Sequence, residues 1–377
     1  MHILHVATLF SPDGAYGGPT RVAGNLAQEL FRRGHRVLLA GAARGFDRIP
    51  DQLEGVPAKL AAARQAVPGI GYAGMTAPGL LRRLRGLTPT PDVVHVHMAR
   101  DLVTLPIAHW VRRRGLPLVV QTHGMIDASD RLLAKPLDRA WTIPVLRHAD
   151  RVYCLTESEV DDIKEVAGPD VRTSVLPNGI PEAAAEAESG QQRRGIVFVG
   201  RLHERKRPLM FVRVAQEAVR RGMDVDFELI GPDEGQGDAV REALAADDGD
   251  GRITWSGALS PDEVLPRLAR AAVLVNTTDN ERFGMSVIEA MAVGCAVVVG
   301  DTCGLADDIS RSDAGLVASE TVGDFAAALV ELHRDDDRRN ALADRGRRLA
   351  LDRFGISGIV DRVEQDYVAV MAERNSS

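Results

Sequence analysis

The sequence predicts an α/β protein made of two doubly wound parallel-sheet domains, and two observations lead to this prediction. Short apolar runs alternate with segments of helical periodicity along almost the whole chain. This order is typical of parallel sheets with helices on both faces. At 377 residues the chain also exceeds the length that one hydrophobic core usually serves, so two domains are expected.

The first series of elements begins at the N-terminus. A glycine-rich turn, 13–20, separates the first apolar run from a helix expected over 21–33, which ends at Gly34 as helices often do. A Gly- and Ala-rich region that reaches to about residue 75 is expected to be irregular, and a short helix should follow over 80–87. The expected strands of this half are 3–8, 37–40, 92–97, 117–121, 151–155 and 173–176.

The domain boundary is expected near residues 177–194. Residues 177–181 have turn chemistry, and 182–194 are rich in Ala, Glu, Gln and Gly without apolar periodicity, as in a linker. A second series then follows, with strands expected at 195–199, 225–230, 253–255, 273–276, 296–299 and 315–317 and helices at 321–332, 337–351 and 356–372. We therefore expect an N-terminal domain (1–185), a C-terminal domain (186–354) and a final helical segment (355–377) that packs back onto the first domain.

The composition and the net charge argue against some classes of binding partner and cellular location. The net charge of −7 and the low content of aromatic residues argue against nucleic acid as a partner. A small excess of basic residues in 1–185 is compatible with weak peripheral contact with a membrane. Because the first strand begins without a signal-peptide pattern and no apolar run approaches about 20 residues, we expect a cytoplasmic protein. The three cysteines lack CxxC spacing and are expected to be buried free thiols.

Residues 281–294 carry the first candidate site. Glu281 and Glu289 are eight positions apart, with a turn predicted at Phe283 and Gly284 between them. The pattern predicts a loop that leads into a short helix, with Glu281 at its mouth and Glu289 about one turn inside. The N–H groups and the positive dipole end of such a junction suit a phosphate group. Two solvated surface acids would be the simplest alternative, but an apolar strand follows the helix, and ligands of βα sheets bind at such junctions.

A second junction lies at residues 198–208. A strand end and Gly200 precede Arg201 and Lys206, and Pro208 falls in the first turn of the next helix, where proline is well tolerated. An arginine and a lysine that converge before a helix form a cationic clamp suited to a diphosphate.

These segments resemble glycosyltransferase family 4, the retaining enzymes with the GT-B fold. Residues 200–206 and 281–291 are similar to the donor-site signature of that family. In the first half, the segments 17–22, 92–97, 122–124 and 176–179 are similar to further family motifs in the same order. No single motif decides the match, but the ordered set spans almost the whole chain.

The resemblance implies a role for each matched residue. Arg201 and Lys206 would hold the diphosphate of a nucleotide sugar and stabilise the charge that grows on it. Glu281 would hold hydroxyls of the transferred sugar, and Glu289 would accept hydrogen bonds from the ribose. His123 would contact the sugar near the reacting carbon. The remaining donor contacts would come from Gly17 and Gly18, which would let their loop approach the diphosphate closely, and from the backbone around Phe283, Gly284, Met285 and Ser286.

The same resemblance implies a retaining reaction without a protein nucleophile, in which the departing phosphate takes the proton of the acceptor hydroxyl. No separate cofactor is expected, because the nucleotide sugar, most simply a UDP- or GDP-sugar, is a co-substrate. No metal is assigned. His95 and His97 share a face of one strand, but without a third ligand in view they are interpreted as structural or cleft-lining. Residues 224–226 resemble the metal-binding DxD motif of other glycosyltransferases. They begin a strand of the second series, however, on the side away from the cleft expected between the two domains.

The chain departs from the family pattern in places. Ala296 replaces a frequent proline, Arg282 stands where a small residue is common, and residues 303–308 differ from the usual Gly-Gly-x-x-Glu segment. The last difference leaves the role of that loop open.

Several functions remain to be distinguished. The turn at 14–18 lacks GxGxxG spacing and the second strand lacks a following acid, which argues against a nicotinamide-dependent oxidoreductase. A nucleotide-sugar epimerase or a silent sugar-nucleotide-binding protein of the same fold is the more serious alternative. The acceptor is expected at residues 42–78 and 124–140. A glycan or lipid-linked intermediate is the first hypothesis, and a small natural product such as an aminocyclitol is the second.

Overall fold

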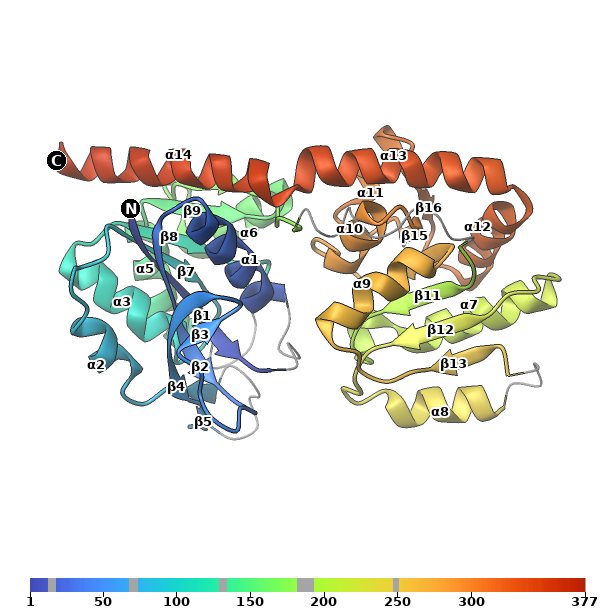
Figure 1. Cartoon of the computed structure of the whole chain (residues 1–377), viewed down its shortest axis with the longest axis horizontal. Helices are drawn as coiled ribbons and strands as arrows, with labels where there is room; N and C mark the ends of the chain where they lie inside the picture. The colour runs from blue at the N-terminus through green and yellow to red at the C-terminus, as the bar shows by residue number, and fades with distance from the viewer. Residues whose placement is uncertain (13–17, 68–73, 129–133, 182–192, 247–250, 377) are drawn as a thin grey trace. The chain divides into compact units, whose positions relative to one another are not determined.

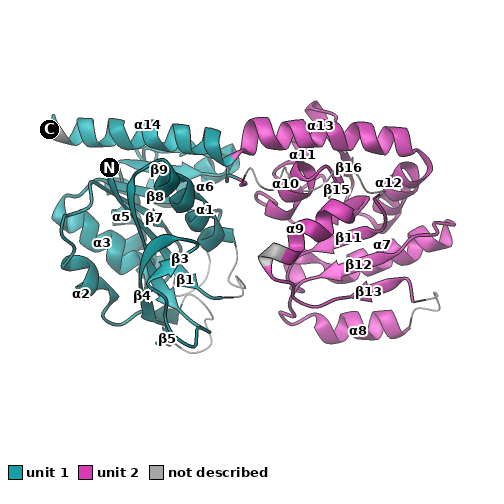
Figure 2. Cartoon of the chain, viewed as in Figure 1, with its two compact units in different colours: residues 1–179, 356–377 teal, residues 180–355 magenta. Residues whose placement is uncertain are grey.

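The structure, a computed structural model, describes residues 1–12, 18–67, 74–128, 134–181, 193–246 and 251–376 (Figure 1). The chain is divided into two compact units (Figure 2). Unit 1 contains Met1–Gly179 and Ile356–Ser377, and unit 2 contains Ile180–Gly355.

Unit 1 is built on an eight-stranded sheet with the order β10-β9-β8-β7-β1-β2-β4-β3. All neighbouring strands are parallel except β3 and β4. The strands are β1 (His2–Phe10), β2 (Arg36–Ala43), β3 (Gln52–Leu53), β4 (Val56–Ala62), β7 (Val93–His97), β8 (Leu118–Gln121), β9 (Arg151–Cys154) and β10 (Thr173–Val175), and β5 (Arg64–Gln65) pairs separately with β6 (Met75–Thr76). β1 has β2 on one side and β7 on the other, so the strand order reverses there. Ligands of doubly wound sheets bind at the carboxyl ends of strands at such a reversal.

The helices of unit 1 follow the strands. They are α1 (Gly18–Arg32), α2 (Leu80–Arg85), α3 (Thr104–Arg114), α4 (Ala134–Leu137), the π-helical turn η2 (Asp138–Thr142), α5 (Ile143–His148), α6 (Glu157–Ala167) and α14 (Ile356–Asn375). α1 has its buried residues on one stripe, including Val22, Leu26 and Leu30. The final helix, α14, belongs to unit 1, where it packs against α1.

The expectation of an irregular region up to about residue 75 is wrong. β2 continues to Ala43, and β4 pairs with it in parallel register from Leu39↔Ala58 to Ala43↔Ala62. The composition of β4, with three alanines and a lysine, has little intrinsic strand preference. Pairing with β2 and burial of Val56 and Leu60 override that local preference.

Unit 2 contains a fully parallel six-stranded sheet with the order β13-β12-β11-β14-β15-β16. The strands are β11 (Ile196–Val199), β12 (Phe227–Ile230), β13 (Ile253–Trp255), β14 (Val273–Asn276), β15 (Ala296–Gly300) and β16 (Leu316–Ala318). The helical elements are η4 (Glu204–Lys206), α7 (Pro208–Arg220), α8 (Gly237–Ala245), α9 (Pro261–Arg270), α10 (Met285–Ala292), α11 (Ala306–Arg311), α12 (Val322–Arg334) and α13 (Asp336–Phe354). The strand order reverses between β11 and β14, so the loops that follow these two strands are neighbours.

Other expectations can be compared with the described residues. Among these residues, every helix is either too short or too polar to span a bilayer. Cys154, Cys295 and Cys303 are buried free thiols, as predicted, and burial raises the pKa of the last two to about 12. The linker expected at 182–194 lies mostly outside the described residues.

Candidate active site

The two predicted junctions of unit 2 meet where its strand order reverses. Gly200–Arg207 follows β11 and Thr277–Gly284 follows β14, the neighbouring strand. The Thr277 hydroxyl donates to the carbonyls of Lys206 and Arg207 at 3.2 Å each. The Asp279 N–H donates to the Arg205 carbonyl at 2.8 Å. These hydrogen bonds join the loops, so cationic and acidic side chains 75 positions apart reach the same edge of the sheet.

Lys206 and Glu281 form an ion pair across this junction, with Lys206 Nζ donating to Glu281 Oε2. Their side chains are 28% and 15% exposed, so the pair is partly shielded from water. Burial alone would raise the pKa of the Glu281 carboxyl, but the charge and hydrogen bond of Lys206 outweigh it and lower that pKa. Hydrogen bonds from Thr278 and from the Gly284 N–H act in the same direction. Glu281 is therefore a carboxylate held in place at the start of α10.

Arg201 points to a different partner. Its Nη1 donates to both carboxylate oxygens of Glu234 at 2.8 Å, and the two side chains are 47% and 35% exposed. Exposed ion pairs of this kind contribute about 0–1 kcal/mol. Because little stability depends on the pair, Arg201 can exchange Glu234 for another anion at small cost.

The Phe283–Ser286 segment forms the turn that the sequence predicts. Gly284 is the N-cap of α10 with φ 65°, a left-handed conformation that glycine adopts without steric cost. Phe283 is buried and packs edge to face against Phe354, with the two ring centroids 5.6 Å apart. Met285 and Ser286 are half-buried in the first helical turn. Glu289 lies one turn further in and is only 4% exposed, so it is more deeply placed than Glu281.

A third strand end in unit 2 supplies residues that sequence reasoning missed. Arg207, which has φ 51°, forms an ion pair with Glu320, and Glu320 Oε1 also accepts a hydrogen bond of 2.9 Å from Thr302. Glu320 follows β16, and a Cβ at Gly300 would lie 2.0 Å from its Oε1. The available signal was the position of Glu320 shortly after the predicted strand 315–317.

In unit 1, His123 lies in the loop directly after β8. It has φ 53°, an uncommon conformation for a residue with a side chain, and Gly124 follows with φ 69°. Strained residues of this kind cluster at functional sites. The buried carboxylate of Glu159 holds the loop, because it accepts hydrogen bonds of 2.5 Å from the Thr122 hydroxyl and the Gly124 N–H. Burial lowers the pKa of His123 to about 3, so its imidazole is neutral.

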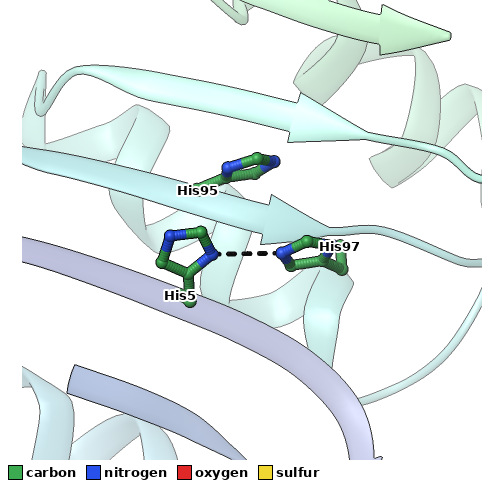
Figure 3. Close-up of side chains that lie close together, drawn as sticks. All are labelled: His5, His95 and His97. Atoms are coloured by element: carbon green, nitrogen blue, oxygen red, sulfur yellow. Dashed lines mark hydrogen bonds between the residues drawn. The ribbon is translucent and has the colours of Figure 1, made fainter. Parts of the chain in front are cut away.

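His95 and His97 on β7 are fully buried, and a third histidine lies with them. His5 on β1 is the register partner of His95, and its Nδ1 is 3.1 Å from His97 Nε2 (Figure 3). The expectation that no third potential ligand stands near this pair is therefore wrong, because parallel pairing of β1 with β7 brings His5 beside them. Ligand atoms of the three residues lie within 4.8 Å of one another.

Arg100, which follows β7, holds Asp127 in the loop after β8 and Asp138 at the start of η2. Its guanidinium donates to both oxygens of Asp138, at 2.8 and 2.9 Å, and to the Asp127 carbonyl at 2.6 Å. This fork fixes described parts of the segment 124–140, where the acceptor is expected. Sequence reasoning did not single out Arg100.

Comparisons with known proteins agree with this arrangement. Residues 17–179 match the model of a glycosyl transferase 4-like domain, and residues 193–335 match that of glycosyl transferases group 1. The D-inositol 3-phosphate glycosyltransferase of Nocardia farcinica is 31% identical over 89% of this chain and 81% of its own length. The corresponding enzyme of Kineococcus radiotolerans is 26% identical over 98% of this chain and 95% of its own length. The chain belongs to glycosyltransferase family 4.

Solved structures show the fold of this transferase. Anabaena HepE in complex with UDP superimposes with a TM-score of 0.77 and 17% identity, covering 98% of this chain and 100% of that one. The trehalose-6-phosphate synthase OtsA superimposes with a TM-score of 0.73 and 14% identity, covering 97% and 99%. The predicted GT-B fold with two Rossmann-like domains is thereby confirmed.

The remaining predicted residues of the transferase can now be placed. Gly17 lies outside the described residues, and Gly18 is the first residue of α1. Asp224 and Asp226 precede β12 at its amino end, and Asp224 forms an ion pair with Arg252. Arg282 is half-buried, and its carbonyl would lie 2.2 Å from a Cβ at Gly304. Segment 303–308, which differs from the family pattern, passes close to the backbone of residues 281 and 282 at Gly304. A side chain at position 304 would collide with that backbone, so glycine is required there.

Proposed function

We propose that this transferase moves a sugar from a nucleotide-diphosphate sugar to a hydroxyl of a small polyhydroxylated acceptor, with retention of anomeric configuration and without a metal ion. The observation that carries the proposal is the Lys206–Glu281 pair at the strand-order reversal of unit 2. A cation and a fixed carboxylate at one sheet edge offer complementary partners for a diphosphate and for sugar hydroxyls. The similar Anabaena structure is a complex with UDP, which supports a nucleoside diphosphate at such a site.

In this proposal Lys206 and Arg201 hold the diphosphate. Lys206 already stands at the junction, and Arg201 reaches the phosphates by leaving its exposed pair with Glu234. As the bond between sugar and phosphate breaks, negative charge grows on the phosphate oxygens. Cations fixed beforehand near that charge stabilise the transition state more than the ground state.

Glu281 and Glu289 have separate roles. Glu281 is an ionised carboxylate without a free proton to give, so it accepts hydrogen bonds from hydroxyls of the transferred sugar. Glu289, deeper in α10, accepts hydrogen bonds from the ribose hydroxyls. The backbone from Phe283 to Ser286 borders the sugar or the phosphate. The neutral imidazole of His123 contacts the sugar near the reacting carbon.

Retention then follows from front-side attack. The acceptor oxygen bonds to the anomeric carbon on the face that the diphosphate leaves, and the departing phosphate oxygen takes the acceptor proton. Lys206 and Arg201 provide the positive charge for the leaving group, so no divalent ion is needed in this scheme.

We infer that the acceptor is a cyclitol phosphate or a related small polyol rather than a glycan or a lipid-linked intermediate. The support is the activity of the similar Nocardia and Kineococcus enzymes, which are D-inositol 3-phosphate glycosyltransferases. Their identity to this chain, 31% and 26%, leaves room for a different cyclitol or substitution pattern.

A thermal-shift panel of UDP, GDP, ADP and TDP, each with and without EDTA, tests the donor site. We expect one diphosphate to raise the melting temperature equally in both conditions, and the shift to shrink in Lys206→Ala and Glu289→Ala. Lys164→Ala, an exposed lysine in unit 1, is the matched control. A shift that EDTA abolishes would overturn metal independence, and the absence of any shift would overturn the transferase proposal.

Incubation of the matching nucleotide sugar with a panel of cyclitols and cyclitol phosphates tests the acceptor. Consumption of donor only when acceptor is present supports transfer. Conversion of the donor without acceptor would indicate an epimerase, and binding without any conversion would indicate a silent protein. NMR of the new glycosidic linkage distinguishes retention from inversion.

A further inference from the structure

The buried histidines of unit 1 form part of a continuous hydrogen-bonded chain that ends at His123. His123 Nε2 is 2.8 Å from His97 Nδ1, and His97 Nε2 is 3.1 Å from His5 Nδ1. His5 Nε2 is 3.4 Å from the hydroxyl of Tyr367 on α14, which is 2.7 Å from His95 Nδ1. Tyr367 and the histidines at 5, 95 and 97 are fully buried, so water does not interrupt the chain.

Two amide side chains lie near the ends of this chain. Gln121 Nε2 donates to Asn178 Oδ1 at 3.2 Å. Gln121 lies near His95 and Asn178 near His123, and each amide partly opposes the fall in pKa that burial causes in its histidine. Among the described residues, His95 Nε2, Gln121 Oε1 and His123 Nδ1 have no hydrogen-bond partner, so the chain is open at both ends. We refer to its five members, His123, His97, His5, Tyr367 and His95, as the circuit.

Every ring in the circuit is neutral. Burial lowers the pKa of His5 and His123 to about 3 and that of His95 and His97 well below its ordinary value. A neutral imidazole has one N–H donor and one bare nitrogen that accepts. The direction of any one hydrogen bond in the circuit therefore fixes the direction of the others.

The two distances at Tyr367 give that direction. The Tyr367 hydroxyl is 2.7 Å from His95 Nδ1, and we assign the hydroxyl as the donor of this short hydrogen bond, which leaves His95 Nδ1 bare. A phenol is a stronger donor than a neutral imidazole, which agrees with the 2.7 Å distance on this side and 3.4 Å on the other.

The direction then passes along the rings. Tyr367 oxygen accepts from His5 Nε2–H, His5 Nδ1 accepts from His97 Nε2–H, and His97 Nδ1 accepts from His123 Nε2–H. The last nitrogen, His123 Nδ1, is left bare. It is buried, and among the described residues no donor reaches it within standard hydrogen-bond geometry.

The same rings are poorly arranged for a metal ion. The planes of His95 and His97 are stacked at 11° with centroids 4.5 Å apart (Figure 3). Nitrogen lone pairs lie in the ring plane, so those of two parallel stacked rings do not converge on one ion. Both nitrogens of His97 are also engaged with His5 and His123.

We propose that Tyr367, His5 and His97 are positioning residues that hold His123 as its Nε2–H tautomer and so fix the orientation of the ring that the proposed function places near the reacting carbon. The role of Tyr367 is notable because it lies 244 positions after His123, on the last helix. The benefit to catalysis rests on the proposed function, whereas the tautomer itself does not.

Long-range ¹H–¹⁵N NMR of the imidazole-labelled protein measures the tautomer without any substrate. His123 is assigned by the loss of its signals in His123→Gln. We expect a protonated Nε2 and a bare Nδ1 in the wild type. In Tyr367→Phe the circuit is interrupted and both tautomers of His123 should be present. Tyr153→Phe is the matched control, because Tyr153 is also buried and close to His95 but hydrogen-bonds to Asp366 outside the circuit.

His95→Phe gives a directional test with a ring of similar size. Without His95 Nδ1, the Tyr367 hydroxyl donates to His5 Nε2 instead, and each following hydrogen bond reverses. His123 should then become the Nδ1–H tautomer. This variant keeps the proposal testable if Tyr367→Phe fails to fold, which circular dichroism would show.

Kinetics add a second readout. In Tyr367→Phe we expect kcat for transfer to fall by about tenfold with little change in the KM of the donor, because the proposed function places His123 at the reacting sugar and not at the diphosphate. An unchanged His123 tautomer in both variants, an Nδ1–H tautomer in the wild type, or stoichiometric zinc bound through His5, His95 and His97 would overturn the proposal. If NMR shows the expected tautomers but no nucleotide binds, the circuit stands and the proposed function fails.

Discussion

Lys206 and Glu281 are separated by 75 positions in the sequence, yet they form a partly buried ion pair at the edge of one sheet. The pair exists because β11 and β14 are neighbours at the strand-order reversal and because Thr277 ties their following loops together. A nucleoside diphosphate bound there would compete with Glu281 for the same ammonium group. The two partners are therefore expected to respond in opposite ways to substitution.

Lys206→Ala should weaken binding of the matching nucleoside diphosphate by about 10- to 100-fold, because a charge-assisted hydrogen bond contributes about 1.5–3 kcal/mol. Isothermal titration calorimetry measures the change. Lys206→Arg keeps the charge and should recover part of the affinity, whereas Lys164→Ala should bind like the wild type. Equal affinities in Lys206→Ala and the wild type would exclude Lys206 from the phosphate site.

Glu281→Gln should leave diphosphate affinity unchanged or increase it, since Lys206 loses its competing carboxylate. Transfer should nevertheless fall by about 100-fold, because Glu281 orients the sugar rather than the diphosphate. Calorimetry with the diphosphate and initial rates with the full donor separate the two effects. Parallel losses in both measurements would show that Glu281 supports the loop as a whole and has no specific contact with the sugar.

Gly304→Ala should displace the loop that contains Glu281. A Cβ at this position would lie 2.2 Å from the Arg282 carbonyl oxygen and 3.3 Å from that of Glu281, so the backbone must move. We expect a loss of about 1–3 kcal/mol in the free energy of unfolding, typical of overpacking, together with weaker donor binding.

Gly358→Ala is the control for this substitution, because a Cβ there meets no atom within 4 Å and the residue lies in α14. It should be neutral or slightly stabilising, as alanine favours helix. Urea denaturation compares the two variants. Wild-type stability and affinity in Gly304→Ala would mean that the crossing of the two loops is looser than the structure shows.

Stability should fall steeply in acid because of the four histidines of the circuit. Their pKa values in the folded protein are far below the value of about 6.5 expected in an unfolded chain, with those of His5 and His123 at about 3. As the pH falls below about 6.5, the unfolded state takes up protons that the folded state does not. Each histidine then removes up to about 1.4 kcal/mol of stability per pH unit.

Urea denaturation between pH 7.5 and pH 5 measures this slope. His97→Gln should reduce the slope by about one proton, although its stability at pH 7.5 is also lower, whereas replacement of the exposed His333 by Gln should leave the slope unchanged. A stability that stays flat down to pH 5 would show that the imidazoles titrate normally in the folded protein.

Local patterns in the sequence were sufficient for much of the architecture. The alternation of apolar runs and helical periodicity predicted the parallel sheets, because burial on both faces favours continuous apolar strands. Turn chemistry at Phe283 and Gly284 and the proline at position 208 predicted the starts of α10 and α7. β4 escaped prediction because its pairing with β2 overrides a weak local preference.

The sequence by itself determined which residue types follow each strand, and so it determined the acidic and cationic residues of the candidate donor site. Only the tertiary structure decided which of them meet. Arg201 pairs with Glu234 and Lys206 with Glu281, and His5 joins His95 through strand register. Tyr367 reaches the same histidines from the last helix, 272 positions after His95. Helix and strand preferences act over a few residues, whereas these contacts depend on strand order and register, which are set by the packing of the whole unit.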